Sequence, residues 1–408
     1  MKLKLEELVT VVGGGTPDRE VDEYWNGDIP WISVKDFKAS LISTSLESIT
    51  ERGLNSSASR LIPAGNVILP TRMALGKVAI NLMDVAINQD LKALLIKDDS
   101  KLNLNYLFYF IKSNEKKIIS HGKGATVKGI TIDVLKDLDL DLPELNVQQK
   151  IASALAEADA LIQKRNEAIA KMDGLVESVF IEMFGDPISN PYGLDTFKFG
   201  EILKKIESGW SPTCDDKPAK EGEWGVLKLS SVTKGVYVPR ENKKLLPGTE
   251  SDSKIEVNEG DLLFTRKNTK DLVGACAYAY VTPRQLMMPD TIFRFQFMSN
   301  ADVEKLFIWG LFNNKRYKKL VIQKLAEGSA GSMPNISKKK LENMQLILPP
   351  IELQQKFSQY LKDIQILKTN MKQQLVKLEE NFQSLLHQAF TGRLQCRDSK
   401  VDDYALKR

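Results

Sequence analysis

An internal repeat constrains this chain more than any other feature of its sequence. The segment LDLDLPELNVQQK ends at Lys150, and a related segment, MQLILPPIELQQK, ends at Lys356, which is 206 residues later. The same offset, without a gap, aligns Gly122 with Gly328, Ile130 with Ile336, Leu135 with Leu341, Pro143 with Pro349, and Phe184 with Phe390. Chance does not produce such a register, so we predict one structural unit used twice.

Upstream of these segments the two copies have diverged more. At offsets near 195, GGGTP (13–17) aligns with SGWSP (208–212), and GDIPWI (27–32) aligns with GEWGVL (222–227). In the same way Thr71 and Arg72 align with Thr265 and Arg266. We therefore expect the first part of each copy to be a domain, here called head 1 and head 2, and the two heads to differ in detail.

A long amphipathic helix is predicted to follow each head, because apolar or small residues recur there at spacings of three and four. In the first copy they are Ile151, Leu155, Ala158, Ile162, Ile169, Met172, Val176, Val179 and Met183; in the second they are Leu353, Phe357, Leu361, Ile364, Leu367, Met371, Leu375, Leu378, Phe382, Leu385 and Ala389. One such stripe alone would suit a helix that only covers its own head. The equal length and register of the two stripes favour helices that pair with each other.

The linker between the copies indicates the direction of the second helix. Each helix would be about 55 Å long at about 1.5 Å per residue, whereas the linker GDPISNPYGLD (185–195) spans at most about 40 Å. Because the chain cannot run back along the first helix, the second helix must return antiparallel to it. We therefore expect heads at opposite ends of the pair, related by an approximate twofold axis, which suits two readers of a DNA double helix.

The predicted fold class is mixed α/β, with two heads separated by two long antiparallel helices. Short β-prone segments occur at 66–70, 77–82, 261–265 and 274–281, and helical spacing occurs at 105–117 and 302–325. The expected boundaries are 1–143 for head 1, 144–184 for the first helix, 185–195 for the linker, 196–349 for head 2, 350–395 for the second helix and 396–408 for a tail.

Composition argues against several enzyme classes. Cys214, Cys276 and Cys396 are far apart and odd in number, so we expect reduced thiols rather than disulfides or a metal knuckle. Two histidines leave almost no material for a histidine zinc site or a Ser/His/Asp triad. No apolar run approaches the roughly 20 residues that cross a bilayer, so a cytoplasmic protein without membrane association is expected. A net charge of +4 permits nucleic-acid binding without requiring it.

Taken together, these motifs resemble the specificity subunits of type I restriction-modification systems. The resemblance covers nearly the whole chain: GGGTP, GDIPWI, the Leu-Pro before each helix, Gln148, Gln149 and Lys150 with Gln354, Gln355 and Lys356, and FGDP (184–187) with FTGRL (390–394). Each fragment is weak alone, but their order and duplication are specific. A member of this family has two target recognition domains, each followed by a helical region.

The resemblance implies a non-catalytic protein that directs other subunits to DNA. Each recognition domain would read one half of a bipartite, asymmetric target in double-stranded DNA, and the helices would set the spacing between the halves. The implied partners are modification (methyltransferase) subunits and restriction (helicase-nuclease) subunits. No cofactor is expected on this chain, because S-adenosylmethionine, ATP and Mg²⁺ would belong to those partners.

Basic residues on loops after predicted strands are the first candidate DNA contacts. PTRMALGK (70–77) carries Arg72 and Lys77, and FTRKNTK (264–270) carries Arg266, Lys267 and Lys270. Such residues are usually just solvated, but the alignment of Arg72 with Arg266 favours a role in DNA binding, since arginine reads guanine and also anchors phosphate.

A glycine- and lysine-rich stretch is the second candidate. HGKGATVKGI (121–130) carries Lys123 and Lys128, and it faces EGSAGSMPNI (327–336), which has nothing equally basic. The two lysines suit phosphate contacts, although the glycines could simply serve turns. The candidate contacts for the modification subunits lie on the helices and are Ile151, Leu155, Ile162, Ile169, Phe357, Leu361, Leu375 and Leu378.

Two other function classes fit parts of the sequence. A Mg²⁺-dependent nuclease of the PD-(D/E)xK kind would use Asp18, Asp36 and Lys38, but head 2 has Ser231-Val232-Thr233 where head 1 has the second acid and the lysine. A coiled-coil scaffold that binds no nucleic acid would also use long antiparallel helices. Such a scaffold has no need of two diverged basic heads.

Overall fold

The computed structural model describes residues 2–124, 128–326 and 333–391. The chain divides into two compact units: unit 1 combines Met1–Asn166 with Gln373–Arg408, and unit 2 is Glu167–Lys372. Each unit therefore contains one head and parts of both long helices. The expectations for Gly328 and the rest of 327–332, for Leu394, for Cys396 and for the tail lie outside the described residues.

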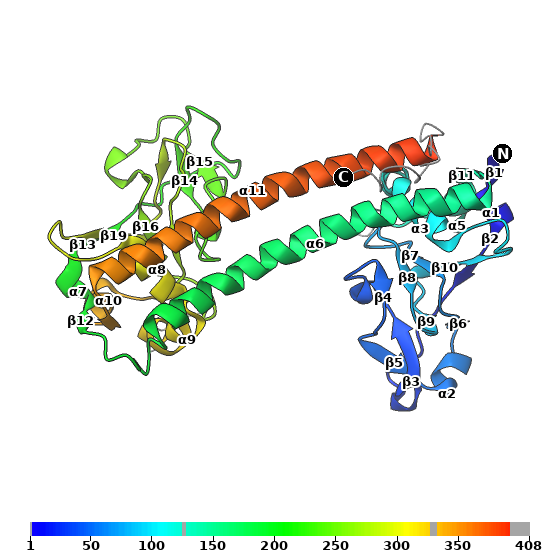
Figure 1. The fold of residues 1–408 in the computed structure, drawn as a ribbon, viewed down its shortest axis with the longest axis horizontal. Helices are drawn as coiled ribbons and strands as arrows, with labels where there is room; N and C mark the ends of the chain where they lie inside the picture. The colour runs from blue at the N-terminus through cyan, green and yellow to red at the C-terminus, as the bar shows by residue number, and fades with distance from the viewer. Residues whose placement is uncertain (1, 125–127, 327–332, 392–408) are drawn as a thin grey trace, which may run out of the picture. The chain divides into compact units, whose positions relative to one another are not determined.

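Head 1 is built around two sheets (Figure 1). One has the strand order β2 (Val9–Gly13), β10 (Leu91–Ile96), β7 (Val67–Pro70), β8 (Ala79–Asn81), β4 (Leu41–Ile42); the other has the order β5 (Glu47–Ile49), β3 (Trp25–Ile32), β9 (Val85–Ile87), β6 (Leu61–Ile62). A further antiparallel pair joins β1 (Lys2–Lys4) to β11 (Asp139–Asp141). The helices of head 1 are α1 (Leu5–Leu8), α2 (Glu51–Asn55), α3 (Leu104–Ser113), α4 (Glu115–Ser120) and α5 (Ile132–Lys136). Strands β7, β8 and β9 are buried along their whole length, which explains their apolar composition.

Head 2 repeats this plan. Its sheets have the orders β13 (Leu203–Ser208), β19 (Ile292–Phe297), β16 (Leu262–Thr265), β17 (Cys276–Tyr278), and β15 (Asn242–Lys244), β14 (Gly225–Leu227), β18 (Leu286–Met287), with a pair formed by β12 (Thr196–Lys198) and β20 (Gln345–Ile347). Its helices are α7 (Phe199–Ile202), α8 (Lys305–Asn313), α9 (Lys315–Tyr317) and α10 (Lys338–Glu342). The mixed α/β class predicted from the sequence is confirmed.

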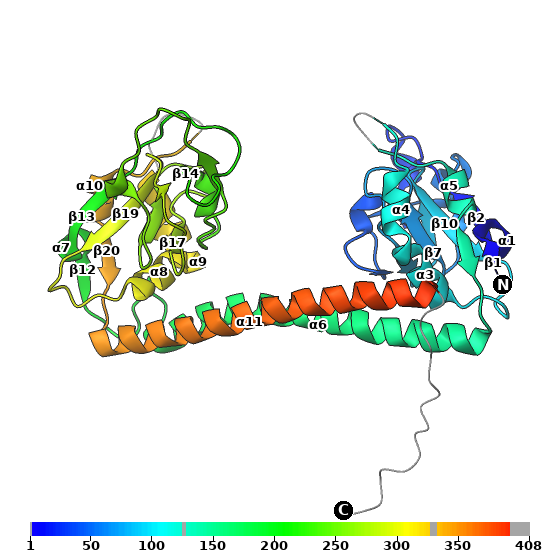
Figure 2. The same ribbon diagram turned by 90° about the horizontal axis from the view of Figure 1, so that it is seen from above.

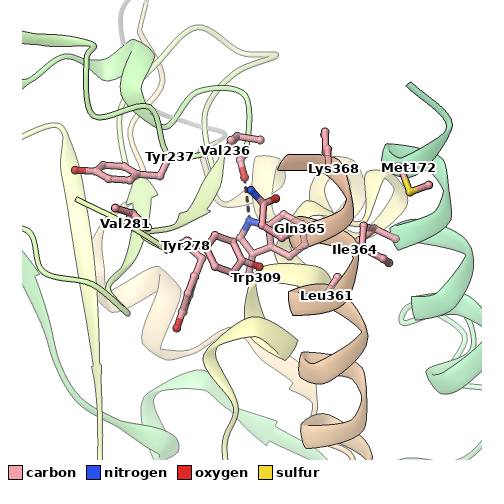
Figure 3. A pocket seen from close by; sticks show the side chains of 13 residues that line it. Met172, Val236, Tyr237, Tyr278, Val281, Trp309, Leu361, Ile364, Gln365 and Lys368 are labelled. Carbon is pink, nitrogen blue, oxygen red and sulfur yellow. Dashed lines mark hydrogen bonds between the residues drawn. The ribbon is translucent and has the colours of Figure 1, made fainter. Parts of the chain in front are cut away.

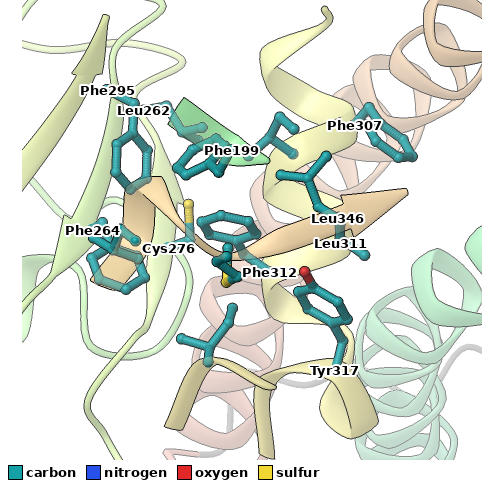
Figure 4. Close-up of a cluster of buried hydrophobic side chains, with 14 of the residues drawn as sticks. Phe199, Leu262, Phe264, Cys276, Phe295, Phe307, Leu311, Phe312, Tyr317 and Leu346 are labelled. Atoms are coloured by element: carbon teal, nitrogen blue, oxygen red, sulfur yellow. The ribbon is translucent and has the colours of Figure 1, made fainter. Parts of the chain in front are cut away.

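The core of head 2 is rich in aromatic side chains (Figure 4). Phe312 packs edge to face on Phe199, Phe264 and Phe295, and Cys276 is buried in the same cluster. Burial raises the pKa of the Cys276 thiol, which therefore stays protonated. Within the described residues Cys214 and Cys276 are free thiols, as predicted.

The repeat extends through the heads, and its offset changes in two steps. Strands β7 and β16 are 195 residues apart, β10 and β19 are 201 apart, and β11 and β20 are 206 apart. The offset of 206 also relates the two long helices, α6 (Leu145–Phe184) and α11 (Ile351–Phe390), each of 40 residues. The extra residues of head 2 lie in connections, where insertions leave the strand register intact.

The long helices run antiparallel within each unit. In unit 1, Leu155 from the first half of α6 shares a core with Phe382 from the second half of α11. In unit 2 the opposite halves meet, since the ring of Phe357 lies 5.5 Å from that of Phe180 and 5.4 Å from that of Phe184. The rings of Phe180 and Phe184 also contact the ring of Phe307 in α8, and Figure 2 shows α8 beside the start of α11. The stripes therefore pack on the other helix and on a head at once, and the view that each helix covers only its own head is wrong.

Asparagines interrupt the two helices predicted inside the heads. The segment 105–117 is split at Asn114 into α3 and α4, and 302–325 is split at Asn314 into α8, α9, a π-helical turn (Lys318–Ile322) and a 3-10 turn (Gln323–Ala326). The Asn314 side chain accepts a hydrogen bond of 3.0 Å from the Tyr317 N–H, which starts a new helix. Apolar spacing continues across both breaks, so periodicity alone could not reveal them.

A buried glutamine ties the start of each long helix to its head. The Gln148 side chain accepts a hydrogen bond of 2.9 Å from the Asn103 N–H and donates to the carbonyls of Lys101 (2.7 Å) and Pro143 (2.9 Å). Gln354 repeats these contacts with the Glu304 N–H (2.9 Å) and the carbonyls of Asp302 (3.1 Å) and Pro349 (2.7 Å). Both side chains are fully buried, so this clamp accounts for the first glutamine of each Gln-Gln-Lys motif.

We predict that Gln354→Ala destabilises unit 2, because one backbone N–H and two carbonyls lose the buried side chain that they bond to. The expected loss in free energy of unfolding is about 1 to 3 kcal/mol, measured by urea denaturation followed by tryptophan fluorescence. Gln355→Ala is the matched control, since Gln355 is exposed. Equal stability of both variants would contradict the clamp.

A buried ionic network distinguishes the core of head 2 from that of head 1. Arg294 in β19 donates hydrogen bonds to the carboxylates of Glu207 (2.6 Å) and Asp261 (2.9 Å) and to the carbonyls of Glu256 (2.7 Å) and Lys254 (2.8 Å). Arg294 pairs across the sheet with Glu207, whereas the corresponding pair in head 1 is Ala93 with Val12. Desolvation raises the pKa of Glu207, but hydrogen bonds from Lys205, Arg294 and Gln296 outweigh it and hold the pKa at about 2.

This network predicts that unit 2 loses stability in acid. Because the pKa of Glu207 is lowered from 4.5 to about 2 on folding, its contribution is present above pH 4.5 and is lost as the pH falls toward 2. Thermal unfolding between pH 6 and pH 2 should show a shallower pH dependence for Glu207→Gln than for the unaltered chain. Glu221→Gln removes an exposed carboxylate of the same head and should leave the dependence unchanged.

Candidate nucleic-acid interface

The glycines of the GGGTP motif let one loop of head 1 approach strand β9. The Gly15 N–H donates a hydrogen bond of 3.0 Å to the Ile87 carbonyl, and a Cβ at Gly14 would lie 1.8 Å from that carbonyl oxygen. In head 2 the Trp210 N–H donates to the Met288 carbonyl at 3.0 Å, and a Cβ at Gly209 would lie 2.0 Å from it. The repeated motif is thus a framework that places the residues after it, and glycine is required for the close approach.

The strand ends carry the candidate basic residues, and their true correspondence follows from the backbone. The Ile130 N–H bonds to the Thr71 carbonyl (2.9 Å), and Arg72 forms an isolated bridge with Gly129. The same contacts in head 2 join Ile336 to Arg266 (2.8 Å) and Lys267 to Asn335. Arg72 therefore corresponds to Lys267, and the alignment of Arg72 with Arg266 is wrong by one residue. The identical dipeptide Thr-Arg lies one position earlier relative to β16, and strand register, not identity, sets the correspondence.

The Arg72 side chain is exposed to solvent and lies next to the buried carboxylate of Asp90. This side chain is 57% exposed, and its guanidinium lies 3.5 Å from Oδ1 of Asp90, a residue that is only 6% exposed. The next residue, Met73, has a φ of 65° and is exposed. Lys77 is exposed too, but its ammonium group donates a hydrogen bond of 3.0 Å to the Phe37 carbonyl.

Lys123 and Lys128 lie beside Arg72 through the backbone of Gly129. Lys123 exchanges two backbone hydrogen bonds of 2.9 Å with Gly129, and the Met73 N–H donates to the Lys128 carbonyl at 3.2 Å. Both lysines are exposed. The loop at 71–77 and the glycine-rich stretch, predicted as separate candidates, are therefore one surface of head 1. The residues between the lysines, 125–127, lie outside the described residues.

The corresponding surface of head 2 is organised differently. Arg266 is half-buried, donates a hydrogen bond of 3.2 Å to the Asn335 side chain, and lies 5.2 Å from the centre of the Phe293 ring. Lys338, at the start of α10, lies 5.6 Å from the same ring. Lys267 and Lys270 are exposed. The equivalent strand ends of the two heads thus present different cationic groups.

Sequence reasoning missed a group of residues beside Arg72. The Arg19 guanidinium lies 3.7 Å from the Trp25 ring centre and 5.0 Å from that of Trp31, and it forms an ion pair with Glu47. Thr16, Arg19 and Trp31 line a cavity of about 290 Å³ together with residues 88–90. The signal was present, because Thr16 and Trp31 belong to the GGGTP and GDIPWI motifs, but only the fold brings the motifs together.

A second hollow, in unit 2, is lined mainly by apolar side chains (Figure 3). Its volume is about 240 Å³, Tyr278 and Trp309 face α11 across it, and Tyr280 also lines it. The Trp309 indole donates a hydrogen bond of 2.9 Å to the Gly235 carbonyl. None of the candidate basic residues lines this hollow.

The nuclease alternative finds no support in the geometry. The Asp36 carboxylate accepts hydrogen bonds of 2.8 Å from the backbone N–H groups of Ser33 and Leu46, so it caps a turn. Among the residues that the structure describes, no three His, Cys, Asp or Glu side chains are grouped so that they could hold a metal ion.

Most of the candidate partner contacts on the helices are buried within their own units. Ile151, Leu155, Ile162, Phe357 and Leu361 are buried in their own units, and Ile169, Leu375 and Leu378 are half-buried. The five buried side chains are not available to a partner without unfolding. The heptad stripe does not face inward throughout, because its predicted members Leu353 and Leu367 are 38% and 50% exposed. Leu161, which corresponds to Leu367 under the 206-residue offset, is 54% exposed. No helix in the described ranges is long and apolar enough to cross a membrane.

Comparison with known proteins decides the family. Residues 1–171 and 191–380 match the family described as type I restriction modification DNA specificity domain. The chain belongs to this family. The type I restriction enzyme MjaIX specificity subunit of Methanocaldococcus jannaschii is 24% identical over 97% of this chain and 93% of its own length. The EcoEI specificity subunit of Escherichia coli is 33% identical over 43% of this chain and 30% of its own length.

Solved structures show the same fold. A chain from a study of complex assembly and conformational transition of the type I restriction-modification system superimposes with a TM-score of 0.60, 18% identity, and coverage of 97% of this chain and 98% of its own. The S subunit of a type I system from M. genitalium superimposes with a TM-score of 0.54, 15% identity and 96% coverage of both chains. The protein is thus a non-catalytic DNA-recognition subunit of a type I restriction-modification system.

The joined surface of head 1 yields a prediction about phosphate contacts. Replacing Lys123 and Lys128 together by alanine should weaken binding to all duplexes alike and lower the slope of log affinity against log salt by about two, since each phosphate contact contributes about 0.9. The slope would be measured by fluorescence anisotropy on the assembled complex. The matched control replaces Lys97 and Lys101, which contact the Glu6 carbonyl and the Asp98 carboxylate elsewhere in head 1. An unchanged slope for the double variant would remove these lysines from the interface.

Proposed function

We propose that heads 1 and 2 read the two different halves of a bipartite DNA target and that α6 and α11 set the distance between the halves. One observation carries the proposal: the heads share a backbone framework but present different side chains at equivalent positions. Arg72 lies beside Asp90 in head 1, whereas the corresponding residues in head 2 are Lys267 and Thr291. Since a base pair is recognised by matched donors and acceptors, unlike side chains on like frameworks favour unlike half-sites.

The helices are the proposed dock for two modification subunits, and these in turn recruit the restriction subunits. Leu161 and Leu367 support this role, because they are exposed apolar residues at equivalent positions of the repeat. Equivalent positions suit two copies of one partner. S-adenosylmethionine, ATP and Mg²⁺ would then act on the partner subunits, and the complex would work on DNA in the cytoplasm.

The two-reader proposal predicts that exchanging one head changes one half-site. Replacing residues 1–143 with the head of a relative that has a different target should alter one half of the preferred sequence and leave the other intact. The measurement is selection of methylated or bound sequences from a random library by the complex with its modification subunits. A change in both halves would contradict independent readers, and absence of DNA binding under every salt condition would favour the scaffold alternative.

The spacing role makes a separate prediction. Deleting residues 163–169 from α6 and the equivalent 369–375 from α11 removes one heptad from each helix, or about 10 Å. The preferred spacer should shorten by about three base pairs, at about 3.4 Å per pair, in the same selection experiment. Deleting one heptad from α6 alone is the control, because it breaks the register of the pair and should reduce binding. An unchanged spacer length after the double deletion would mean that the helices do not set the distance between the half-sites.

A further inference from the structure

The loop between β9 and β10 brings three polar side chains, Asn88, Gln89 and Asp90, to a cavity that Met73, the residue after Arg72, also lines. All three line the cavity together with Thr16, Arg19 and Trp31. Asn88 and Asp90 are buried. The cavity has a volume of about 290 Å³, and one short loop supplies polar groups to its wall. Such a cavity suits a ligand group that is recognised by hydrogen bonds.

The hydrogen bonds inside this loop fix which groups remain for a ligand. The Asn88 Oδ1 accepts a hydrogen bond of 3.2 Å from the Asp90 N–H, and the Gln89 Oε1 accepts one from the Thr16 hydroxyl. Each amide oxygen therefore already accepts one hydrogen bond. In the part of the chain that the structure describes, neither amide NH₂ group has a hydrogen-bond partner, so the loop offers donors.

The acid of the loop positions Arg72. Among the described residues, Oδ1 of Asp90 is buried and has no hydrogen-bond partner, and the Arg72 guanidinium is 3.5 Å away. A buried carboxylate is stabilised by an adjacent cation, which restricts the guanidinium to one side of the loop. The arginine then has N–H groups left that point outward, because its side chain is more than half exposed.

The charges around the cavity favour a base over a phosphate. Arg72 is paired with Asp90, and Arg19 is paired with Glu47. Each arginine is therefore paired with a carboxylate. Lys35 also lines the cavity, so a phosphate would meet two acidic groups as well as three basic ones. A neutral base edge makes the hydrogen bonds without that repulsion.

We propose that Arg72, with the amide groups of Asn88 and Gln89, reads the guanine of one G·C pair in the half-site bound by head 1. Guanine presents two acceptors, N7 and O6, in the major groove, and this edge matches a cluster of donors. Adenine presents only one acceptor, N7, next to the N6 amino donor, so it matches the donors of Arg72 and of the two amides less well than guanine does. Asp90 is a positioning residue that acts through Arg72.

Head 2 has the same framework with the opposite polarity. Ser211 corresponds to Thr16, and its hydroxyl bonds to Asp290, which corresponds to Gln89. Where head 1 offers an amide donor, head 2 has a carboxylate, which can only accept. The residues that correspond to Asn88 and Asp90 are Pro289 and Thr291, so head 2 lacks both amide donors and keeps Lys267 as the counterpart of Arg72. The combination of an arginine with two amide donors is therefore specific to head 1.

The inference rests on the proposed function and is tested on the complex with its modification subunits. Once random-library selection has defined the target, Arg72→Ala should relax one guanine position in one half-site, with a loss of discrimination of roughly 5- to 150-fold. Asp90→Asn should relax the same position to a lesser degree. Neither variant should change the slope of log affinity against log salt, because no phosphate contact is lost. Arg52→Ala is the control, since it removes an arginine of head 1 that is exposed and paired with Glu23 outside the cavity.

A second measurement leaves the protein unaltered and so does not depend on variants that fold. Replacing each guanine of the target in turn by 7-deazaguanine removes the N7 acceptor, and one position in the half-site of head 1 should then lose at least fivefold in affinity. Loss of that sensitivity in Arg72→Ala would assign the contact. This inference alone would be overturned if both half-sites were recognised normally and no base position depended on Arg72. It would also be overturned if Arg72→Ala lowered the slope of log affinity against log salt by about one. A complex without sequence preference would instead overturn the proposed function.

Discussion

Burial of each long helix against a head at both of its ends is the constraint on which the rest of the structure depends. Phe180 and Phe184, at the end of α6, pack on Phe307 of head 2 and on Phe357 at the start of α11. A buried aromatic side chain removes about 150 to 250 Å² from water, which is a large share of what holds a helix to a domain. Because each helix packs in both units, neither head has a complete core without residues from the other copy of the repeat.

This constraint explains where the two copies are alike and where they differ. Residues that hold the helices to the heads repeat with the same contacts, as Gln148 and Gln354 do. The loops that carry polar groups at the strand ends have the same backbone bonds but other side chains, such as Gln89 and Asp290. Even the cores have diverged, since Arg294 occupies a position that is Ala93 in head 1. The two copies thus differ at the strand ends while the contacts that hold the helices stay alike.

Much of the fold could be predicted because its signals are local or periodic. The heptad pattern and the 206-residue offset predicted both long helices, and short apolar segments such as 66–70 predicted buried strands. The breaks at Asn114 and Asn314 could not be predicted, because capping by a side chain leaves the apolar period intact. The candidate site was predicted only in part. Arg72, Lys123 and Lys128 were identified by charge, but Asp90 and the neighbouring amides carry no basic signal and reach Arg72 only through the pairing of β7 with β10.

The division of the chain into units also has a consequence for the order in which it folds during synthesis. Unit 2 is a continuous segment, Glu167–Lys372, and all of its contacts are available once that segment has left the ribosome. Unit 1 needs Gln373 and the residues after it, which are made last, to cover the apolar face of α6 beside head 1. The part of the chain that is translated first is therefore the part that is completed last, and until then Leu155 and Ile162 lack the side chains of α11 that bury them.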